Sequence, residues 1–327
     1  MQPGLSTHVF FQHRLHPGLL DALAAAGART AASGMTAAGS MTIEVFAARH
    51  HFDYTDASAV RELASWFRSN DVRAVLHQPI YIAGHGRSFS STDQDHWSRH
   101  VAPNLDLIAP EKSSCIAAMD EVKRALESAE QVPFTAAVVS LGLNHSAWDE
   151  PAIERSLTAI EHLKAFASPL GLRLLLENME NEVTTPEHLL YILKTGHFDS
   201  VGVCLDLGHL HLAQPVEGAP RDSGVGAAIE LLGTRIAQLH LHDNHGPFNP
   251  NSDMKDEHLW PGDGAPAGGM IDWAAVCASL AALPAATPGI LEAESGRDEP
   301  AESVTRKAEK AFRTLADLAA AAASQKL

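Results

Sequence analysis

The stretch that decides the fold begins with LRLLLEN (Leu172–Asn178) and continues through VGVCLD (Val201–Asp206) to RIAQLHLHD (Arg235–Asp243). Its three apolar runs are almost continuous in Leu, Val, Ile and Ala, with little alternation between apolar and polar residues. Such runs are typical of parallel strands that helices cover on their outer side. The segments between the runs have helical spacing. The stretch therefore predicts consecutive strand–helix units of a parallel sheet.

Five further runs of the same kind lie outside this stretch: THVFF (Thr7–Phe11), MTIEVF (Met41–Phe46), VRAVLH (Val72–His77), FTAAVVS (Phe134–Ser140) and GILEAE (Gly289–Glu294). Helix start signals, such as Thr185 followed by Pro186, lie in the segments between the eight runs. Eight such units in 327 residues predict one α/β domain, 1–327, folded as a single (β/α)₈ TIM barrel with its active site at the C-terminal ends of the strands. A doubly wound open sheet is the alternative, but no glycine-rich phosphate turn follows the first run.

The composition excludes several classes of protein. Lys and Arg number 24 against 40 Asp and Glu, so the formal net charge is −16, and the basic residues do not cluster. Because clustered Lys and Arg hold a phosphate backbone, we expect no nucleic-acid partner. Three widely spaced cysteines without a CxxC pair predict neither disulfides nor a thiolate zinc site. The sequence has no secretory signal and no run near the roughly 18 apolar residues of a membrane span, so we expect a cytoplasmic protein without a membrane partner.

Polar side chains interrupt the apolar runs at the points where the predicted strands end. Glu177 ends one run and Asp206 the next, His240 and His242 lie at the end of the third, and Glu292 follows the aliphatic part of the last. Because parallel strands in a barrel all end at one face, we expect these side chains to converge. Three carboxylates at close range repel one another, and a divalent cation removes that conflict.

The strand ends therefore predict a site for one divalent metal ion, with ligands Glu177, Asp206, His240 and Glu292. This oxygen-rich set suits Mn²⁺ best, with Mg²⁺, Co²⁺, Zn²⁺ or Fe²⁺ as alternatives, and leaves positions open for substrate oxygens. Each residue alone has a simpler interpretation. Asp206 in DLGH is also a good helix cap, and single histidines at strand ends are often structural. The prediction depends on matching ligand types at four successive strand ends.

At this point a family resemblance is plain. The segments LLLENMEN, VGVCLDLGHLHL, IAQLHLHDN, HLWPGDG followed by MIDW, and ILEAES resemble the xylose isomerase-like TIM-barrel superfamily. This superfamily contains sugar and sugar phosphate isomerases and epimerases, inosose dehydratases and endonuclease IV. The resemblance covers most of the chain and does not separate these members. It implies the same four metal ligands, with Glu294 as the alternative to Glu292.

The resemblance also implies roles for the residues around the metal. Glu177 and Glu292 match the acid–base pair that lies on opposite sides of the sugar in members acting on ketoses. His209, in the DxxH pattern, matches a residue that contacts the substrate or a further metal. His77 matches a histidine that faces the same pocket.

Two comparisons with endonuclease IV point in opposite directions. Ser140 stands where that enzyme has a zinc-binding histidine at the end of strand four, and His145 follows five residues later. Asp256 and His258, in DEHLWPGDG, resemble its DxH zinc pair. We expect Asp256 and His258 to lie mainly in the substrate pocket, with a second metal as the alternative.

Together these patterns predict a metal-dependent isomerase or epimerase of a sugar, sugar phosphate or polyol ketone. The metal would polarise a carbonyl while a glutamate removes the proton from the neighbouring carbon. The expected partner is a small-molecule carbohydrate, and a homo-oligomer is left open. An inosose-type dehydratase is the nearest alternative. An endonuclease IV-like phosphodiesterase is disfavoured by the charge and Ser140, and a noncatalytic sugar-binding barrel by the two opposed glutamates.

Overall fold

Eight parallel strands form a closed barrel in this computed structural model, which describes residues 1–32, 41–82, 104–144, 146–213, 223–246, 256–263 and 270–324. Each strand pairs with its neighbours in sequence, and the first pairs with the last to close the barrel. The strands are β1 (Gln2–Ser6), β2 (Thr42–Phe46), β3 (Arg73–His77), β4 (Phe134–Ser140), β5 (Arg173–Glu177), β6 (Gly202–Asp206), β7 (Ile236–Leu241) and β8 (Pro288–Leu291). The predicted TIM barrel is confirmed.

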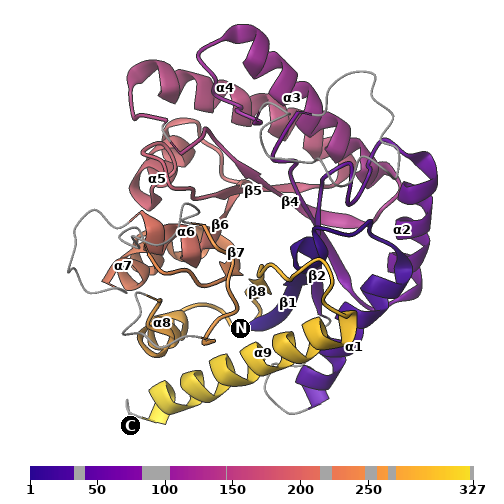
Figure 1. Cartoon of the computed structure of the whole chain (residues 1–327). Coiled ribbons are helices and arrows are strands. Elements are labelled where there is room, and N and C mark those ends of the chain that lie inside the picture. The colour runs from indigo at the N-terminus through magenta and orange to yellow at the C-terminus, as the bar shows by residue number, and fades with distance from the viewer. Residues whose placement is uncertain are drawn as a thin grey trace.

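Helices surround the barrel (Figure 1). They are α1 (Pro17–Ala32), α2 (Ala57–Ser69), α3 (Lys112–Glu127), α4 (Glu150–Ala167), α5 (Pro186–Thr195), α6 (Leu207–Leu212), α7 (Ser223–Leu232), α8 (Trp273–Leu280) and α9 (Ala301–Ser324). The side chains of Asp56, Thr185 and Asp272 cap α2, α5 and α8 by accepting backbone N–H bonds. Helix α9 packs against both α1 and α8, so the last helix covers the seam where β8 meets β1. Within the described ranges, no helix has the length and apolarity to cross a membrane.

Alternate residues of each strand face either the helices or the inside of the barrel. On β2, Ile43 and Val45 belong to the large apolar core between sheet and helices, while Glu44 hydrogen-bonds across the interior to β7. A smaller apolar cluster fills the barrel; its members are Val75, Ala136, Val138, Leu175 and Cys204. Polar residues follow this cluster toward the C-terminal ends of the strands. The inside of the barrel thus consists of an apolar layer and, toward the C-terminal ends of the strands, a polar layer.

The first strand differs from the sequence prediction. Thr7–Phe11 is predicted as a strand, but the strand is Gln2–Ser6, and Thr7–Phe10 forms a 3₁₀ turn capped by the side chain of Ser6. Val9 and Phe10 are buried, so the apolar pattern reported burial rather than extended backbone. Gly4 fits inside the barrel because a Cβ at that position would overlap Ile290. The prediction failed because Pro and Gly lower strand propensity, whereas here pairing on both sides stabilises the strand.

Candidate metal centre

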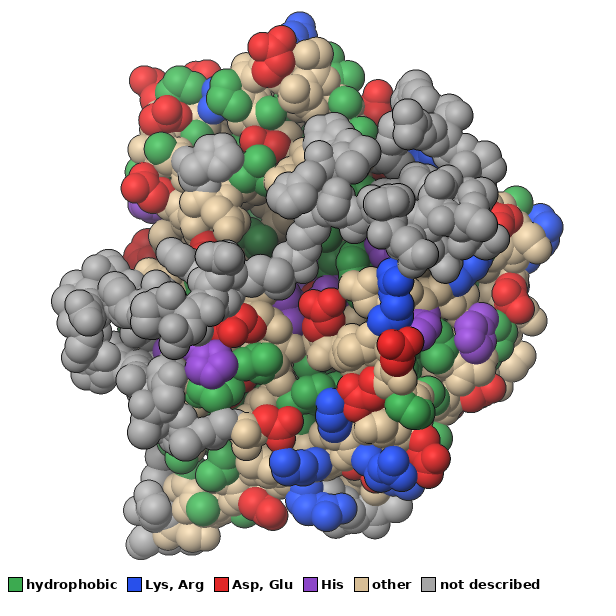
Figure 2. All heavy atoms as spheres, viewed as in Figure 1, with side chains coloured by type: hydrophobic (Ala, Val, Ile, Leu, Met, Phe, Trp, Pro, Cys, Tyr) green, Lys and Arg blue, Asp and Glu red, His purple; other side chains and the backbone are tan. Residues whose placement is uncertain are grey.

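The C-terminal ends of β5 to β8 bring Glu177, Asp206, His240 and Glu292 together. One donor atom of each residue lies within 4.8 Å of the others, and all four residues are buried. Nδ1 of His240 lies 2.7 Å from Oε1 of Glu177, 2.8 Å from Oε2 of Glu292 and 3.4 Å from Oδ2 of Asp206. Three carboxylates therefore surround one imidazole nitrogen. Figure 2 shows acidic and histidine side chains at the surface near the middle of the face in view.

The charges of this cluster are balanced by protons on histidines. Burial alone would raise the pKa of Glu177, but His240 and His77 lower it to about 2. Burial alone would lower the pKa of His240, but the carboxylates around it, Glu292, Glu44 and Glu177 among them, raise it well above its ordinary value. Oε2 of Glu292 lies 2.8 Å from Nδ1 of His240 but forms no well-aligned hydrogen bond among the described residues. Converging carboxylates, an imidazole and an unsatisfied oxygen fit a divalent cation, which would replace the proton.

Glu44 belongs to this region and was missed in the sequence. Its Oε2 lies 2.9 Å from Nε2 of His240, the ring nitrogen opposite the carboxylate cluster. Gln238 donates to the same oxygen at 2.6 Å. The signal in the sequence is a lone glutamate inside the apolar run MTIEVF. Its partners His240 and Gln238 are on β7, and only the closure of the barrel brings β2 and β7 within contact distance.

A second cluster lies beside the first and consists of His209, His242, Asp256 and His258. One donor atom of each lies within 4.8 Å of the others. Nε2 of His209 and Nε2 of His258 lie 3.3 Å and 3.0 Å from Oδ2 of Asp256, and Nδ1 of His242 lies 3.8 Å from Oδ1. Nδ1 of His242 and Oδ1 of Asp256 have no hydrogen-bond partner within the described part of the chain.

The three imidazoles of this second cluster are anchored through their other nitrogens. The acceptors are the carbonyl of Asn178 for His209 (3.0 Å), the carboxylate of Asp206 for His242 (3.0 Å) and the carbonyl of Glu292 for His258 (2.6 Å). Such anchoring fixes the orientation of each ring, so the other nitrogen of each ring faces Asp256. Three imidazoles and one carboxylate form a donor set that suits Zn²⁺. The sequence predicts that His242 converges with the other strand-end side chains, but nothing in the sequence places it against Asp256.

The remaining predicted residues lie around the first cluster. Nε2 of His77 is 3.3 Å from Oε2 of Glu177, and its ring stacks on Phe46. Glu294 is not part of either cluster, since its carboxylate instead accepts a bond from Gln12 at 3.3 Å. Ser140 accepts a bond from Gln78. His145 lies outside the described residues.

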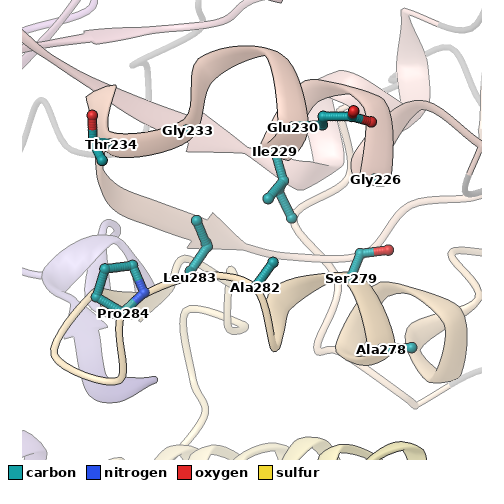
Figure 3. Close-up of a pocket in the computed structure, with 10 residues that line it drawn as sticks. All are labelled: Gly226, Ile229, Glu230, Gly233, Thr234, Ala278, Ser279, Ala282, Leu283 and Pro284. Atoms are coloured by element: carbon teal, nitrogen blue, oxygen red, sulfur yellow. The ribbon is translucent and has the colours of Figure 1, made fainter. Parts of the chain in front are cut away.

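A groove elsewhere on the barrel does not carry this chemistry. It has a volume of about 800 Å³ and lies between α7 and the segment that follows α8, near the N-terminal ends of β7 and β8 (Figure 3). Ile229, Ala282, Leu283 and Pro284 line it, with Glu230 as a charged member. Neither candidate metal cluster contributes to it. The two candidate metal clusters lie at the opposite end of the strands.

Comparison with known proteins agrees with this geometry. A family profile described as "Xylose isomerase-like TIM barrel" matches residues 28–317. The chain belongs to this family. Among curated proteins it is 37% identical over 90 residues to the uncharacterized protein y4fM of Sinorhizobium fredii, covering 28% of this chain and 22% of that one. It is 28% identical over 168 residues to a probable endonuclease 4 of Carboxydothermus hydrogenoformans, covering 48% of this chain and 57% of that one. The match thus spans about a fifth of the first relative and little more than half of the second.

Solved structures share the fold over nearly the whole chain. A zinc-bound IOLI protein superposes with a TM-score of 0.68 at 17% identity, covering 97% of this chain and 98% of that one. A D-psicose 3-epimerase of Clostridium cellulolyticum H10, solved with D-tagatose, superposes with a TM-score of 0.64 at 15% identity, covering 98% and 99%. At these identities the likeness establishes the fold alone.

Proposed function

We propose that this protein is a metal-dependent isomerase or epimerase of a carbohydrate, acting by proton transfer at a carbon next to a carbonyl. One observation carries the proposal. Glu177 and Glu292 come from different strands and lie 2.7 Å and 2.8 Å from the same nitrogen of His240. Two carboxylates that share one cation position also flank whatever substrate occupies the open side of that cation.

In this proposal Glu177 and Glu292 each have two tasks, as metal ligands and as the proton acceptor and donor. Both pKa values are lowered by neighbouring histidines despite burial, so both groups are ionised at neutral pH and able to accept a proton. A bound divalent cation supplies Lewis acidity at the substrate carbonyl. His77, directed at Glu177, is placed to bind a substrate hydroxyl.

We propose a second cation at the second cluster, in place of the direct substrate contacts expected for His209, Asp256 and His258. One ring nitrogen of each histidine in this cluster faces the carboxylate of Asp256, at 3.0 to 3.8 Å, rather than a common open space. A cation between them would satisfy Nδ1 of His242 and Oδ1 of Asp256, for which the described residues supply no hydrogen-bond partner. The donor set favours Zn²⁺ there and Mn²⁺ at the carboxylate-rich first cluster.

A phosphodiesterase is the second candidate, because the second cluster is present and one curated relative is a probable endonuclease 4. The residues beside His77, at the edge of the first cluster, argue against a phosphodiesterase. There Ser140 and Gln78 form a hydrogen-bonded pair and offer no imidazole. An isomerase-type reaction needs no metal on that side.

The test combines metal analysis with solvent exchange. Protein loaded with Mn²⁺ should transfer deuterium from D₂O into a ketose or polyol ketone, followed by NMR or mass spectrometry. Glu177→Gln and Glu292→Gln should each lower the exchange rate about 10²- to 10⁴-fold, the usual effect of losing a positioned acid or base. Glu294→Gln is the matched control, since it removes a carboxylate from the same loop outside the clusters, and it should keep near wild-type exchange.

Metal content must accompany these rates, because Gln is a weaker ligand than Glu. Fully metal-loaded Gln variants that exchange at the wild-type rate would disprove the two-glutamate assignment. Exchange that is absent from a broad panel of ketoses and inososes, with cleavage of a phosphodiester instead, would favour the second candidate.

A further inference from the structure

We propose that Glu44 is a positioning residue that sets the tautomer of His240, so that Nδ1 of His240 is free to bind a cation. The inference rests on the metal centre of the proposed function but not on the reaction performed there. It concerns a carboxylate in β2, across the barrel from β7, that contacts no substrate in our proposal.

Glu44 is an unusual residue for the inside of a barrel. It is 0% exposed. Among the described residues its hydrogen-bond partners are Nε2 of His240 at 2.9 Å and the amide of Gln238 at 2.6 Å, and Oε1 has no partner. Burying a carboxylate without a Lys or Arg partner lowers the free energy of unfolding. An apolar side chain at this position would make the folded protein more stable. The contact with His240 therefore needs an explanation other than stability.

The tautomer of His240 decides whether the cluster can bind metal. A neutral imidazole carries one N–H and one lone pair. In the metal-free protein both ring nitrogens face carboxylates, Nε2 facing Glu44 and Nδ1 facing Glu177. Because a carboxylate can only accept, Glu44 would keep the remaining proton on Nε2 when a cation displaces the proton of Nδ1, and the lone pair for the cation would then be on Nδ1. That nitrogen faces Glu177, Asp206 and Glu292, at 2.7 to 3.4 Å.

Gln238 provides the competing arrangement. Its amide nitrogen lies 3.1 Å from Nε2 of His240. Without the carboxylate of Glu44, the amide would donate to Nε2, and the ring proton would move to Nδ1 and bond Glu177 or Glu292. That state would hold a proton on the nitrogen that the cation needs. Glu44 removes it by engaging both the amide and the Nε2 proton on one oxygen.

The experiment measures metal affinity in the absence of substrate. Mn²⁺ or Zn²⁺ binding is followed by competition with a chromophoric chelator. Glu44→Gln should weaken binding at the first cluster about 10- to 100-fold, the usual effect of losing the partner of a metal-bound histidine. Gln238→Met keeps Glu44 and removes the competing amide, so it should bind at least as tightly as wild type.

A reciprocal exchange gives the decisive comparison. The double variant Glu44→Gln/Gln238→Glu has the same atoms and the same net charge, and it returns a carboxylate to Nε2 of His240 from the other strand. It should regain most of the lost affinity. Thermal unfolding of each metal-free variant reports whether the barrel is intact, and Glu44→Asp, which keeps a carboxylate, should lie between wild type and Glu44→Gln.

The possible failures are distinguishable. A folded Glu44→Gln variant that binds metal within about threefold of wild type would overturn the inference, and so would a folded double variant no better than Glu44→Gln. Wild-type protein that binds no metal at the first cluster would overturn both this inference and the proposed centre. Metal binding that follows the expected series, with no deuterium exchange in any substrate, would reject only the proposed reaction.

Discussion

Single residues at the barrel mouth have two roles that sequence analysis treats as alternatives. Oδ1 of Asp206 accepts the backbone N–H of His209 at 2.7 Å and so caps α6. The same carboxylate accepts from His242 and presents Oδ2 toward His240 at 3.4 Å. The cap holds the carboxylate in one orientation before any cation arrives. A helix cap and a candidate metal ligand are therefore the same feature here.

The protonation of His240 leads to a pH dependence of metal affinity. Its pKa is raised well above the ordinary value, so the metal-free protein carries a proton there at neutral pH that a cation must displace. Affinity should rise up to tenfold per pH unit between about pH 6 and 8, with about one proton released per metal bound at the first cluster. Chelator competition and proton release into weakly buffered solution measure both quantities. An affinity that stays flat over this range would show that His240 does not ligate.

At the scale of elements, the sequence predicts best what local pattern determines. The runs that became β5, β6 and β7 are continuous because both faces of each strand are buried, and that pattern is visible without any partner. Strand β1 was misplaced because its pairing with β2 and β8 outweighs the composition of QPGLS. Glu44 was missed for a related reason, since its partner His240 is 196 positions away. Convergence within one end of the barrel is predictable, whereas contacts across its interior are not.

The first turn of α6 packs closely against His242, which directly follows β7. This contact supports a prediction about the second cluster. A Cβ at Gly208 would overlap the ring of His242. Gly208→Ala should therefore displace His242, lower the metal content by up to the equivalent bound at the second cluster, and cost about 1–3 kcal/mol of stability. Elemental analysis and thermal unfolding measure the two effects. Gly224→Ala in α7 is the control, because its nearest atom would be Leu210 Cγ at 3.8 Å, and both quantities should stay near wild type. Unchanged metal content in a folded Gly208→Ala variant would argue against His242 as a ligand.

At the scale of the whole molecule, the closed parallel barrel places the C-terminal ends of all its strands at one face. There buried carboxylates and histidines lie together, and the formal net charge of the chain is −16. The fold is shared with a zinc-bound protein and with an epimerase solved with a ketose. The compact neutral substrate proposed above is compatible with these charges, because hydroxyls and a cation would hold it. A long polyanion faces repulsion from the rest of the molecule.

This balance predicts the behaviour of the protein toward DNA. Duplex DNA carries one negative charge per roughly 1.7 Å of its axis, and binding requires many Lys and Arg contacts. With 24 basic against 40 acidic residues, and Ser140 in place of an imidazole, the Zn²⁺-loaded protein should neither bind nor incise an abasic duplex at about 150 mM salt. Gel-based incision is the measurement, and the probable endonuclease 4 of Carboxydothermus hydrogenoformans is assayed beside it under the same conditions. Incision that depends on Zn²⁺ and disappears in His258→Ala would mean that the second cluster works on phosphodiesters. The acidic surface would then have to be neutralised locally, and the carbohydrate assignment would be given up.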